Sequence, residues 1–594
     1  MLDDSKTPPA FLGVARSVTG RRWVGPDAYA ERLGLAIAQT AALPEIVGRV
    51  LALRGVGPEE AEGFLAPTLR ALMPDPSRLA DMDRAAERLA LAVRRRERIA
   101  LFGDYDVDGA ASVALMLDWL GALGLEATPY IPDRIDEGYG PNLPAMTGLG
   151  AAHDLLICLD CGSAAPEPIA AACRAGADVL VVDHHLTEGA VPGALAVVNP
   201  NRADCPSGQG HLCAAGVAFL LLAATNRALR GQGAFAGRPE PDLRAWLDLV
   251  ALATIADVTP LIGLNRAFVR QGLGVLARRG RPGLAALADV AGLTAPPSAR
   301  DLGFALGPRI NAGGRVGAAD LGTRLLATRC PDEAAALAAR LDGLNRERRE
   351  IEAAVLAAAA EQAEARGADG PLVWAAGEGW HAGVVGIVAS RLKDRFNRPA
   401  VVIGLDGAEG KGSGRSVPGV DLGSAVAALA AEGLLLKGGG HRMAAGLTVA
   451  AARLEAAMDA LGGRLAAQGA GTAGPEDLAI DGALAPGGAS VELVARLEAA
   501  GPFGPANPAP RLAFAGVRVQ GVKPVGTGHM RCRFAGPGGS VDAIAFRAED
   551  SGLAAALADA GASGQPVHAA GRLEIDDWGG RRRAKLRLED LAIP

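Results

Sequence analysis

Acids and histidines directly follow three apolar runs of this 594-residue sequence. The segments are RIALFGDYDVDG, HDLLICLD and ADVLVVDHH, and in each one the polar side chains begin where the apolar run stops. They supply Asp104, Asp106, Asp108, Asp160, Asp183, His184 and His185. Each cluster alone is compatible with an ordinary turn, because Asp and Gly are common turn formers. Three such clusters in succession are much harder to explain as turns.

A shared location would give these acids a definite chemistry. Carboxylates that are brought together repel one another, and several would be protonated unless cations lay among them. Carboxylate oxygens suit Mg²⁺ or Mn²⁺, and a histidine ligand favours Mn²⁺ over zinc. Two such ions can lower the pKa of a water molecule and neutralise a phosphoryl group. The residue types therefore predict hydrolysis of a phosphate ester at a two-metal site.

The elements expected around these residues bring them to one edge of a sheet. From residue 99 onward, short apolar runs alternate with helical segments, which is typical of βαβ units on a parallel sheet. The acids would then lie at the carboxyl ends of the strands, where open α/β sheets bind their ligands. A further acid, Asp257, ends the apolar helical segment LDLVALATIA. A carboxylate is unfavourable at the C-terminus of a helix, so we expect Asp257 to have a function.

The rest of the sequence indicates several further units. Residues 334–367 contain no proline and are rich in Ala, Leu, Glu and Arg, which predicts one long helix or a helix pair. A second alternation of apolar and helical segments follows, and short strand-like runs fill the C-terminal part. The expected divisions are an N-terminal helical extension (1–80), an α/β domain with a parallel sheet (81–330), a connecting helix (331–368), a second α/β domain (369–470) and a small antiparallel barrel (475–594).

Composition narrows the class of protein. The net charge of −6 gives no overall attraction to nucleic acid, so any polyanion must be held in a local groove. Seven cysteines are few for this length and indicate a reducing compartment, and we interpret Cys158 and Cys161 as buried residues rather than zinc or redox ligands. We expect no membrane span, because no apolar run reaches about 18 residues. The N-terminus does not resemble a secretory signal, so we expect a cytoplasmic protein.

Glycine-rich segments carry a second set of polar side chains. PRINAGGR, GSGR and GGGHRMAAG combine arginine, serine, asparagine or histidine with glycines. Glycine-rich turns expose backbone N–H groups to anions, so these segments suit phosphate contacts as well as plain turns. The candidate side chains are Arg309, Asn311, Arg315, Ser413, Arg415 and His441. In addition, residues 503–541 contain five Lys or Arg and no acid, which favours a nucleic-acid groove on the barrel.

The motifs DYDVDG, LDCG, VVDHH and IADVTPL, in this order, resemble the DHH phosphoesterase superfamily. Within it, the segments FGDYDVDGAAS, YIPDRIDEGYG, GFALGPRINAGGRVG, WHAGVVGIVASRL, GSGRSVPGVDL and GGGHRMAAG are similar to the RecJ single-stranded-DNA-specific exonucleases. The likeness covers roughly residues 10–594. It implies a parallel-sheet DHH domain, a connecting helix, a second α/β domain of the DHHA1 type and a C-terminal all-β OB-fold.

The resemblance also implies an activity and a role for each residue. Members of the family remove nucleotides from single-stranded DNA in the 5′ to 3′ direction with two Mn²⁺ or Mg²⁺ ions, in recombination and repair. By motif, Asp106, Asp108, Asp160, His184 and Asp257 match metal ligands, while Asp104 stands where other branches have a histidine. His185 would face the scissile phosphate and Asp183 would orient a histidine. Single-stranded DNA is the implied partner, with a single-strand DNA-binding protein and a recombination helicase as further candidates.

Two other functions fit part of the pattern. A related phosphoesterase could act on a cyclic dinucleotide, a very short oligonucleotide or pyrophosphate, but a small substrate requires neither the barrel nor the N-terminal extension. A replication scaffold with a degenerate DHH core would be expected to have lost some acids, and here the full set is present. The exonuclease hypothesis therefore accounts for most of the sequence.

Overall fold

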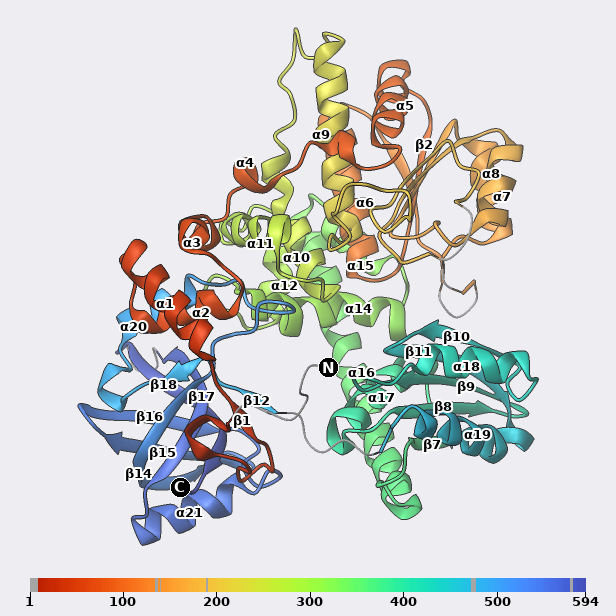
Figure 1. Ribbon diagram of the computed structural model, residues 1–594. Coiled ribbons are helices and arrows are strands. Elements are labelled where there is room, and N and C mark those ends of the chain that lie inside the picture. The colour runs from red at the N-terminus through yellow and green to blue at the C-terminus, as the bar shows by residue number, and fades with distance from the viewer. Residues whose placement is uncertain (1–8, 134–136, 139, 188–190, 472–476, 577–580) are drawn as a thin grey trace, which may run out of the picture.

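The computed structural model describes residues 9–133, 137–138, 140–187, 191–471, 477–576 and 581–594. In Figure 1, a parallel-sheet domain lies at the top, a second α/β domain lies at the lower right and a β-rich domain lies at the lower left. Helices in the middle of the chain lie between the three. Part of the motif YIPDRIDEGYG lies outside the described residues.

The first domain is built on a five-stranded sheet in which every pairing is parallel, as predicted. The strand order is β3-β2-β4-β5-β6, and the central strands β2 and β4 are buried along their whole length. Full burial explains why these strands read as unbroken apolar runs rather than alternating ones. The strands are β2 (Ile99–Gly103), β3 (Ala127–Tyr130), β4 (Leu155–Leu159), β5 (Asp178–Val182) and β6 (Ala196–Val198).

Helices cover both faces of this sheet. One face shares a core with α5, α6 and α9, and the other packs against α7 and α8. The helices are α5 (Met82–Arg95), α6 (Val107–Ala122), α7 (Leu143–Ala152), α8 (Pro166–Ala175) and α9 (Ala214–Gly231). All three sequence clusters therefore follow strands at the carboxyl edge of one sheet, β2, β4 and β5.

A helical region completes the domain and leads into the connecting helix. Its helices are α10 (Leu247–Ala256), α11 (Gly263–Leu276), α12 (Pro282–Val290), α13 (Ala299–Asp301), a π-helical turn (Leu302–Leu306), α14 (Gly307–Val316) and α15 (Leu321–Ala327). The connecting element is one uninterrupted helix, α16 (Pro331–Arg366). Pro331 occupies its first turn and Gly367 follows its end with a φ of 85°, as expected for a proline start and a glycine stop.

The second α/β domain corrects one prediction about its glycine-rich segments. Its sheet has the order β10-β11-β9-β8-β7, and only β7 and β8 are parallel. GSGR belongs to β9, so the prediction of a turn there is wrong. GGGHRMAAG does turn, at Arg442 and Met443, but its glycines lie in β10 and β11 rather than in the turn. The elements are β7 (Val373–Glu378), α17 (Ala382–Phe396), β8 (Ala400–Asp406), β9 (Glu409–Arg415), α18 (Leu422–Ala431), β10 (Lys437–His441), β11 (Ala444–Ala450) and α19 (Leu454–Ala467).

The reason for the glycines in β9 is close packing within the sheet. A Cβ at Gly412 would lie 2.8 Å from Ile403 and 3.0 Å from Leu447, on the strands at either side. A Cβ at Gly414 would lie 2.7 Å from Leu422 at the start of α18. These distances are shorter than van der Waals contact, so a side chain at either position would displace its neighbours in the sheet.

The C-terminal domain is the expected small barrel, although it is not purely antiparallel. Its sheet has the order β13-β14-β15-β16-β18-β17, and a further pairing of β14 with β17 closes it. The pairs β16–β18 and β13–β14 are parallel. The elements are β12 (Leu478–Ala479), β13 (Gly482–Ala483), α20 (Val491–Glu498), β14 (Leu512–Val525), β15 (His529–Gly536), β16 (Gly539–Ala545), α21 (Leu553–Ser563), β17 (Val567–Asp576) and β18 (Arg583–Ala592).

The N-terminal segment packs on this barrel rather than standing apart. Strand β1 pairs with β12, and the indole Nε1 of Trp23 donates to Asp590 Oδ2 at 2.9 Å. Side chains of α1 and α2, among them Ile37 and Val47, share one core with the barrel strands. Its elements are β1 (Trp23–Val24), α1 (Ala28–Thr40), α2 (Glu45–Leu53), α3 (Ala61–Leu65) and α4 (Leu69–Leu72). Among the described helices, none is long and apolar enough to cross a membrane.

Candidate metal centre

The loop between β2 and α6 holds the first three acids in place. Asp106 is the N-cap of α6, and its Oδ1 accepts the backbone N–H groups of Asp108 at 2.9 Å and Gly109 at 3.1 Å. A Cβ at Gly109 would lie 2.5 Å from the carbonyl oxygen of Asp104, so only glycine fits this tight loop. Asp104 and Asp108 are both buried.

The N-terminus of α9 positions Asp108. The carboxylate accepts the N–H of Ala214 at 2.6 Å and that of Ala215 at 2.8 Å, one on each oxygen. These amides belong to the first turn of α9, where N–H groups have no partner within the helix and the dipole favours negative charge. Nothing in the sequence indicated that the start of α9 would hold an acid of the centre.

Asp160 follows β4 in a backbone conformation that side-chain-bearing residues rarely adopt. Its φ is +63°, and its side chain is only 2% exposed. Oδ1 of Asp160 is buried and accepts no hydrogen bond within the described residues, while His184 Nε2 lies 3.3 Å away. The flanking Cys158 and Cys161 are buried and belong to no candidate metal group in that part of the chain.

Asp183 organises the two histidines that follow β5. Its Oδ1 accepts the N–H of His184 at 2.7 Å, the N–H of His185 at 3.2 Å and the ring Nδ1 of His185 at 2.8 Å. Its Oδ2 accepts the N–H of Ser163 at 3.0 Å. Burial alone would raise the pKa of Asp183, but these hydrogen bonds and the charge of His185 lower it. Asp183 thus holds the backbone of both histidines and the ring of His185.

The clusters converge on His184. Its Nε2 lies 3.3 Å from Asp160, 3.7 Å from Asp108 and 3.7 Å from Asp257. Asp257 is the C-cap of α10, so this helix end completes the edge formed by the strands. Three groups have ligand atoms within 4.8 Å of one another, namely Asp160 with His184 and His185, Asp108 with His184 and Asp257, and Asp104 with Asp106 and Asp160.

The crowding of the carboxylates raises the pKa of several of them. Burial, followed by the charges of the neighbouring acids, raises the pKa of Asp160 well above its usual value and also raises that of Asp108. Burial and the charges of Asp108 and Asp106 raise the pKa of Asp257 to about 8. For His185, burial opposes protonation, but Asp183 outweighs it and raises the pKa to about 9. The acids therefore require compensating positive charge to be ionised together at neutral pH.

This donor set fits hard divalent cations. Asp160 presents a buried oxygen without a hydrogen-bond donor in the described structure, and it belongs to two of the three candidate groups. Carboxylate oxygens with one imidazole suit Mn²⁺ or Mg²⁺, and their shared acid suits two adjacent ions. The arrangement is therefore suited to metal-assisted hydrolysis of a phosphate ester.

Two asparagines support the histidines and were not identified from the sequence. Nδ2 of Asn199 donates to the carbonyl of His185 at 2.9 Å and to Ser163 Oγ at 3.0 Å, and Asn201 Nδ2 donates to the carbonyl of His184. Both follow β6, the neighbouring strand of the sheet. Their position directly after a strand, in VVNPN, is the same signal that identified the acids.

Two of the candidate phosphate contacts, Arg309 and Asn311, belong to α14. Both side chains already have partners elsewhere in the structure. Arg309 pairs with Asp342 of α16 at 2.9 Å and donates to the carbonyl of Ala305. Oδ1 of Asn311 accepts the N–H of Val107 at 3.1 Å, which holds the start of α6. Both residues therefore support the metal loop and the connecting helix in this structure.

The remaining candidates lie beside or line a groove between α14 and the second domain. Arg315 donates to the carbonyl of Gly383 at 2.9 Å, and Ser413 accepts from Arg415 Nη1 at 3.0 Å. Arg315 and Ser413 line a groove of about 610 Å³ together with Lys411 and Lys437, two cations that the motifs did not identify. His441 is exposed at the end of β10.

Comparison with known proteins matches each of the three domains. The model of the DHH family, N-terminal domain, matches residues 98–254, that of the DHHA1 domain matches 369–467, and that of the RecJ OB domain matches 480–590. The single-stranded-DNA-specific exonuclease RecJ of Dickeya dadantii (strain 3937) is 38% identical over 572 residues, covering 92% of this chain and 96% of the relative. This chain belongs to the RecJ family.

Solved RecJ structures are similar along nearly the whole chain. The RecJ structure from Thermus thermophilus in complex with Mn²⁺ matches with a TM-score of 0.79 at 30% identity, covering 96% of this chain and 79% of that one. The Mg²⁺ complex from the same organism matches with a TM-score of 0.71 at 29% identity, covering 96% and 78%. The fold predicted for a RecJ-like protein is thereby confirmed, and the ions in these relatives are the two that the acid cluster favours.

Proposed function

We propose that this RecJ-family protein is a metal-dependent exonuclease that degrades single-stranded DNA in the 5′ to 3′ direction, in recombination and repair. The observation that carries the proposal is the convergence of Asp108, Asp160 and Asp257, from the ends of β2, β4 and α10, on His184 after β5. A groove lined by cations lies where α14 meets the second domain. A substrate of cyclic-dinucleotide size is disfavoured, because the chain also contains a RecJ OB domain.

The metal ligands divide into two sets that share one acid. Asp104, Asp106 and Asp160 would hold one ion, and Asp108, His184 and Asp257 would hold the other together with Asp160. When bound, two divalent ions supply an activated water nucleophile and neutralise charge on the phosphoryl group. The hydrogen bonds that α9 donates to Asp108 fix the orientation of this ligand before any ion binds.

His185 is placed to act on the substrate rather than to fill the ligand set. Its side chain is 41% exposed at the edge of the centre, and Asp183 accepts from its Nδ1. A protonated imidazole beside the metals would donate a hydrogen bond to a phosphate oxygen and stabilise the charge that develops there. Asp183 would orient the ring for this role, and in the metal-free protein its carboxylate raises the pKa of His185 to about 9.

The groove between α14 and the second domain is suited to the terminal phosphate of the strand. Arg315 lines it from α14 and Ser413 lines it from β9, where Arg415 donates to Ser413. Arginine binds phosphate through two parallel hydrogen bonds, which would fix the 5′ end at a set distance from the hydrolysed bond. On the barrel, Lys523 and Arg531 are exposed and lie opposite each other across β14 and β15, where they would contact the continuing strand.

End-labelled DNA tests the proposal. The purified chain with Mn²⁺ is expected to release a 5′ label from single-stranded DNA at once as a mononucleotide and to shorten 3′-labelled strands progressively. Blunt duplex DNA should remain largely intact. Equal degradation of duplex, or immediate loss of a 3′ label, would contradict the assigned specificity.

We further propose that the protein acts in the cytoplasm on DNA that other proteins expose. A recombination helicase would produce the single strand, and a single-strand DNA-binding protein would coat it. Stimulation of digestion when such a helicase opens a duplex would support this; unchanged digestion across helicase concentrations would contradict it.

A further inference from the structure

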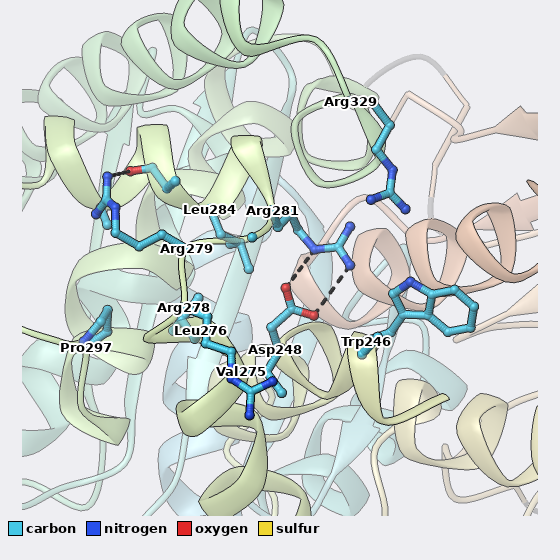
Figure 2. Close-up of a pocket in the computed structure, with 14 residues that line it drawn as sticks. Trp246, Asp248, Val275, Leu276, Arg278, Arg279, Arg281, Leu284, Pro297 and Arg329 are labelled. Carbon is cyan, nitrogen blue, oxygen red and sulfur yellow. Dashed lines mark hydrogen bonds and ion pairs between the residues drawn. The ribbon is translucent and has the colours of Figure 1, made fainter. Parts of the chain in front are cut away.

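A cavity of about 290 Å³ lies at the N-terminal end of α10, at the opposite end of this helix from Asp257. Asp248, in the first turn of α10, lines it. Nine residues separate Asp248 from Asp257, or about 14 Å at roughly 1.5 Å per residue. The cavity, whose lining residues are drawn in Figure 2, is therefore separate from the metal centre.

Two of the four arginines that line the cavity share one acid. Arg281 is buried, with its Nε 2.8 Å from Asp248 Oδ2 and its Nη1 2.9 Å from Asp118 Oδ2. Arg329 contacts the other oxygen of Asp118 at 2.6 Å, and its side chain is 60% exposed. Figure 2 shows the guanidinium groups of Arg281 and Arg329 on the same side of the cavity as the indole of Trp246.

The other two arginines come from the loop between α11 and α12. Arg279 pairs with Asp289 at 2.6 Å and has a φ of +55°, an uncommon conformation for a residue with a side chain. Arg278 is exposed, and it forms no ion pair with any described residue. Four guanidinium groups thus face three carboxylates, which leaves the cavity with excess positive charge.

The rest of the wall is apolar. Trp246, Leu276, Leu284 and Pro297 line it. Leu284 and Ala285 belong to the first turns of α12, whose N-terminal end carries partial positive charge. The cavity therefore presents cations and an apolar surface to the same ligand. Its volume is close to the lower limit for small-molecule sites, about 300 Å³, and too small for a folded partner.

We propose that this cavity is a second binding site, for a free nucleoside monophosphate. Arg329, whose side chain is exposed, would bind the phosphate through paired hydrogen bonds, and Arg278 would add positive charge to the same cavity. The planar base would lie against the apolar wall beside Trp246. Arg281, held by two buried acids, would form the floor of the site rather than contact the ligand directly.

Calorimetric titration of the full chain with dAMP, in the presence of Mn²⁺, tests the proposal. Binding to this cavity should survive Asp160→Ala, which removes a candidate metal ligand, and should weaken at least tenfold in Arg278→Ala with Arg329→Ala. Arg324→Ala is the matched control, because Arg324 is an exposed arginine with surface ion pairs outside the cavity. Deoxyadenosine should bind far more weakly than dAMP, since it lacks the phosphate.

The same titrations identify the alternatives. Binding that is lost in Asp160→Ala and kept in the double arginine variant would place all nucleotide at the metal centre and overturn the proposal. Tighter binding of a 5′-phosphorylated trinucleotide than of dAMP, lost in the double variant, would assign the cavity to a strand end instead of a free nucleotide and overturn it too. Binding of a polyglutamate peptide but not of dAMP would overturn it as well.

Discussion

Replacement of Asp183 by asparagine should reduce turnover without removing the metals. Asp183 accepts three hydrogen bonds on Oδ1 and one on Oδ2, and asparagine of the same size would turn an N–H₂ group toward at least one of these donors. Loss of a hydrogen bond to a buried charge costs roughly 1.5 to 3 kcal/mol. At about 1.4 kcal/mol per tenfold, kcat should fall about 10-fold to 150-fold.

The assay is single-strand digestion by Asp183→Asn at saturating Mn²⁺, with kcat and KM measured separately. KM should change little, because Asp183 is buried and contacts no expected substrate position. The pKa of His185 should fall toward its usual value once the carboxylate charge is gone, so the alkaline limb of the kcat profile should move to lower pH. Calorimetry should show Mn²⁺ affinity within a few-fold of the parent.

Asp178→Asn is the matched control, since Asp178 starts the same strand at its far end and pairs with Arg88 at the surface. It should leave kcat and its pH profile unchanged. An Asp183→Asn variant with unchanged kcat and pH profile would refute the positioning role. A loss of kcat that is matched by a loss of Mn²⁺ affinity would show that Asp183 only maintains the metal site.

Three other variants or conditions test the charges of the protein. Arg415→Ala should lose most of the preference for 5′-phosphate over 5′-hydroxyl ends while it binds Mn²⁺ normally in calorimetry; a retained preference would place recognition of the end elsewhere. Lys523→Gln with Arg531→Gln should reduce the slope of log affinity against log salt for long single strands by about 1.4, at roughly 0.7 per phosphate contact, and an unchanged slope would remove both from the DNA path. The metal-free protein should lose stability as the pH rises from 6 through 8, because the pKa of Asp257, raised to about 8, means that the folded state holds a proton below that pH. Mn²⁺ should therefore raise Tm more at pH 8.5 than at pH 6, and equal gains would contradict the charge argument.

The sequence predicted the acids of the centre because a general rule places them. Asp104, Asp160 and His184 follow apolar strands, and the carboxyl ends of parallel strands meet at one edge. Nothing in the local pattern indicated that Ala214 and Ala215 would donate to Asp108, since backbone N–H groups are the same in every helix. Contacts that depend on tertiary packing rather than on residue type are therefore the ones that were missed.

The prediction of a turn in the glycine-rich segment GSGR was wrong for a different reason. Gly412 and Gly414 stand in a strand because Ile403, Leu447 and Leu422 come too close for a side chain. A turn and a crowded strand both select glycine, one through its backbone freedom and the other through its lack of a Cβ. Sequence spacing alone does not separate the two causes, whereas the positions of the cross-strand neighbours do.

Helix α14 links the metal centre to the groove that would hold the terminal phosphate. Asn311 accepts from Val107 at the start of the metal loop, and Arg315, four residues later, donates to Gly383 of the second domain. A Cβ at Gly314 would lie 3.0 Å from Tyr105. The backbone of α14 therefore packs directly against Tyr105 of the metal loop. Together with α16, which shares a core with α17 and β7, this short helix positions the second domain relative to the acids. For the proposed exonuclease, that constraint sets the distance from a captured 5′ phosphate to the bond that is hydrolysed, and hence the size of the product.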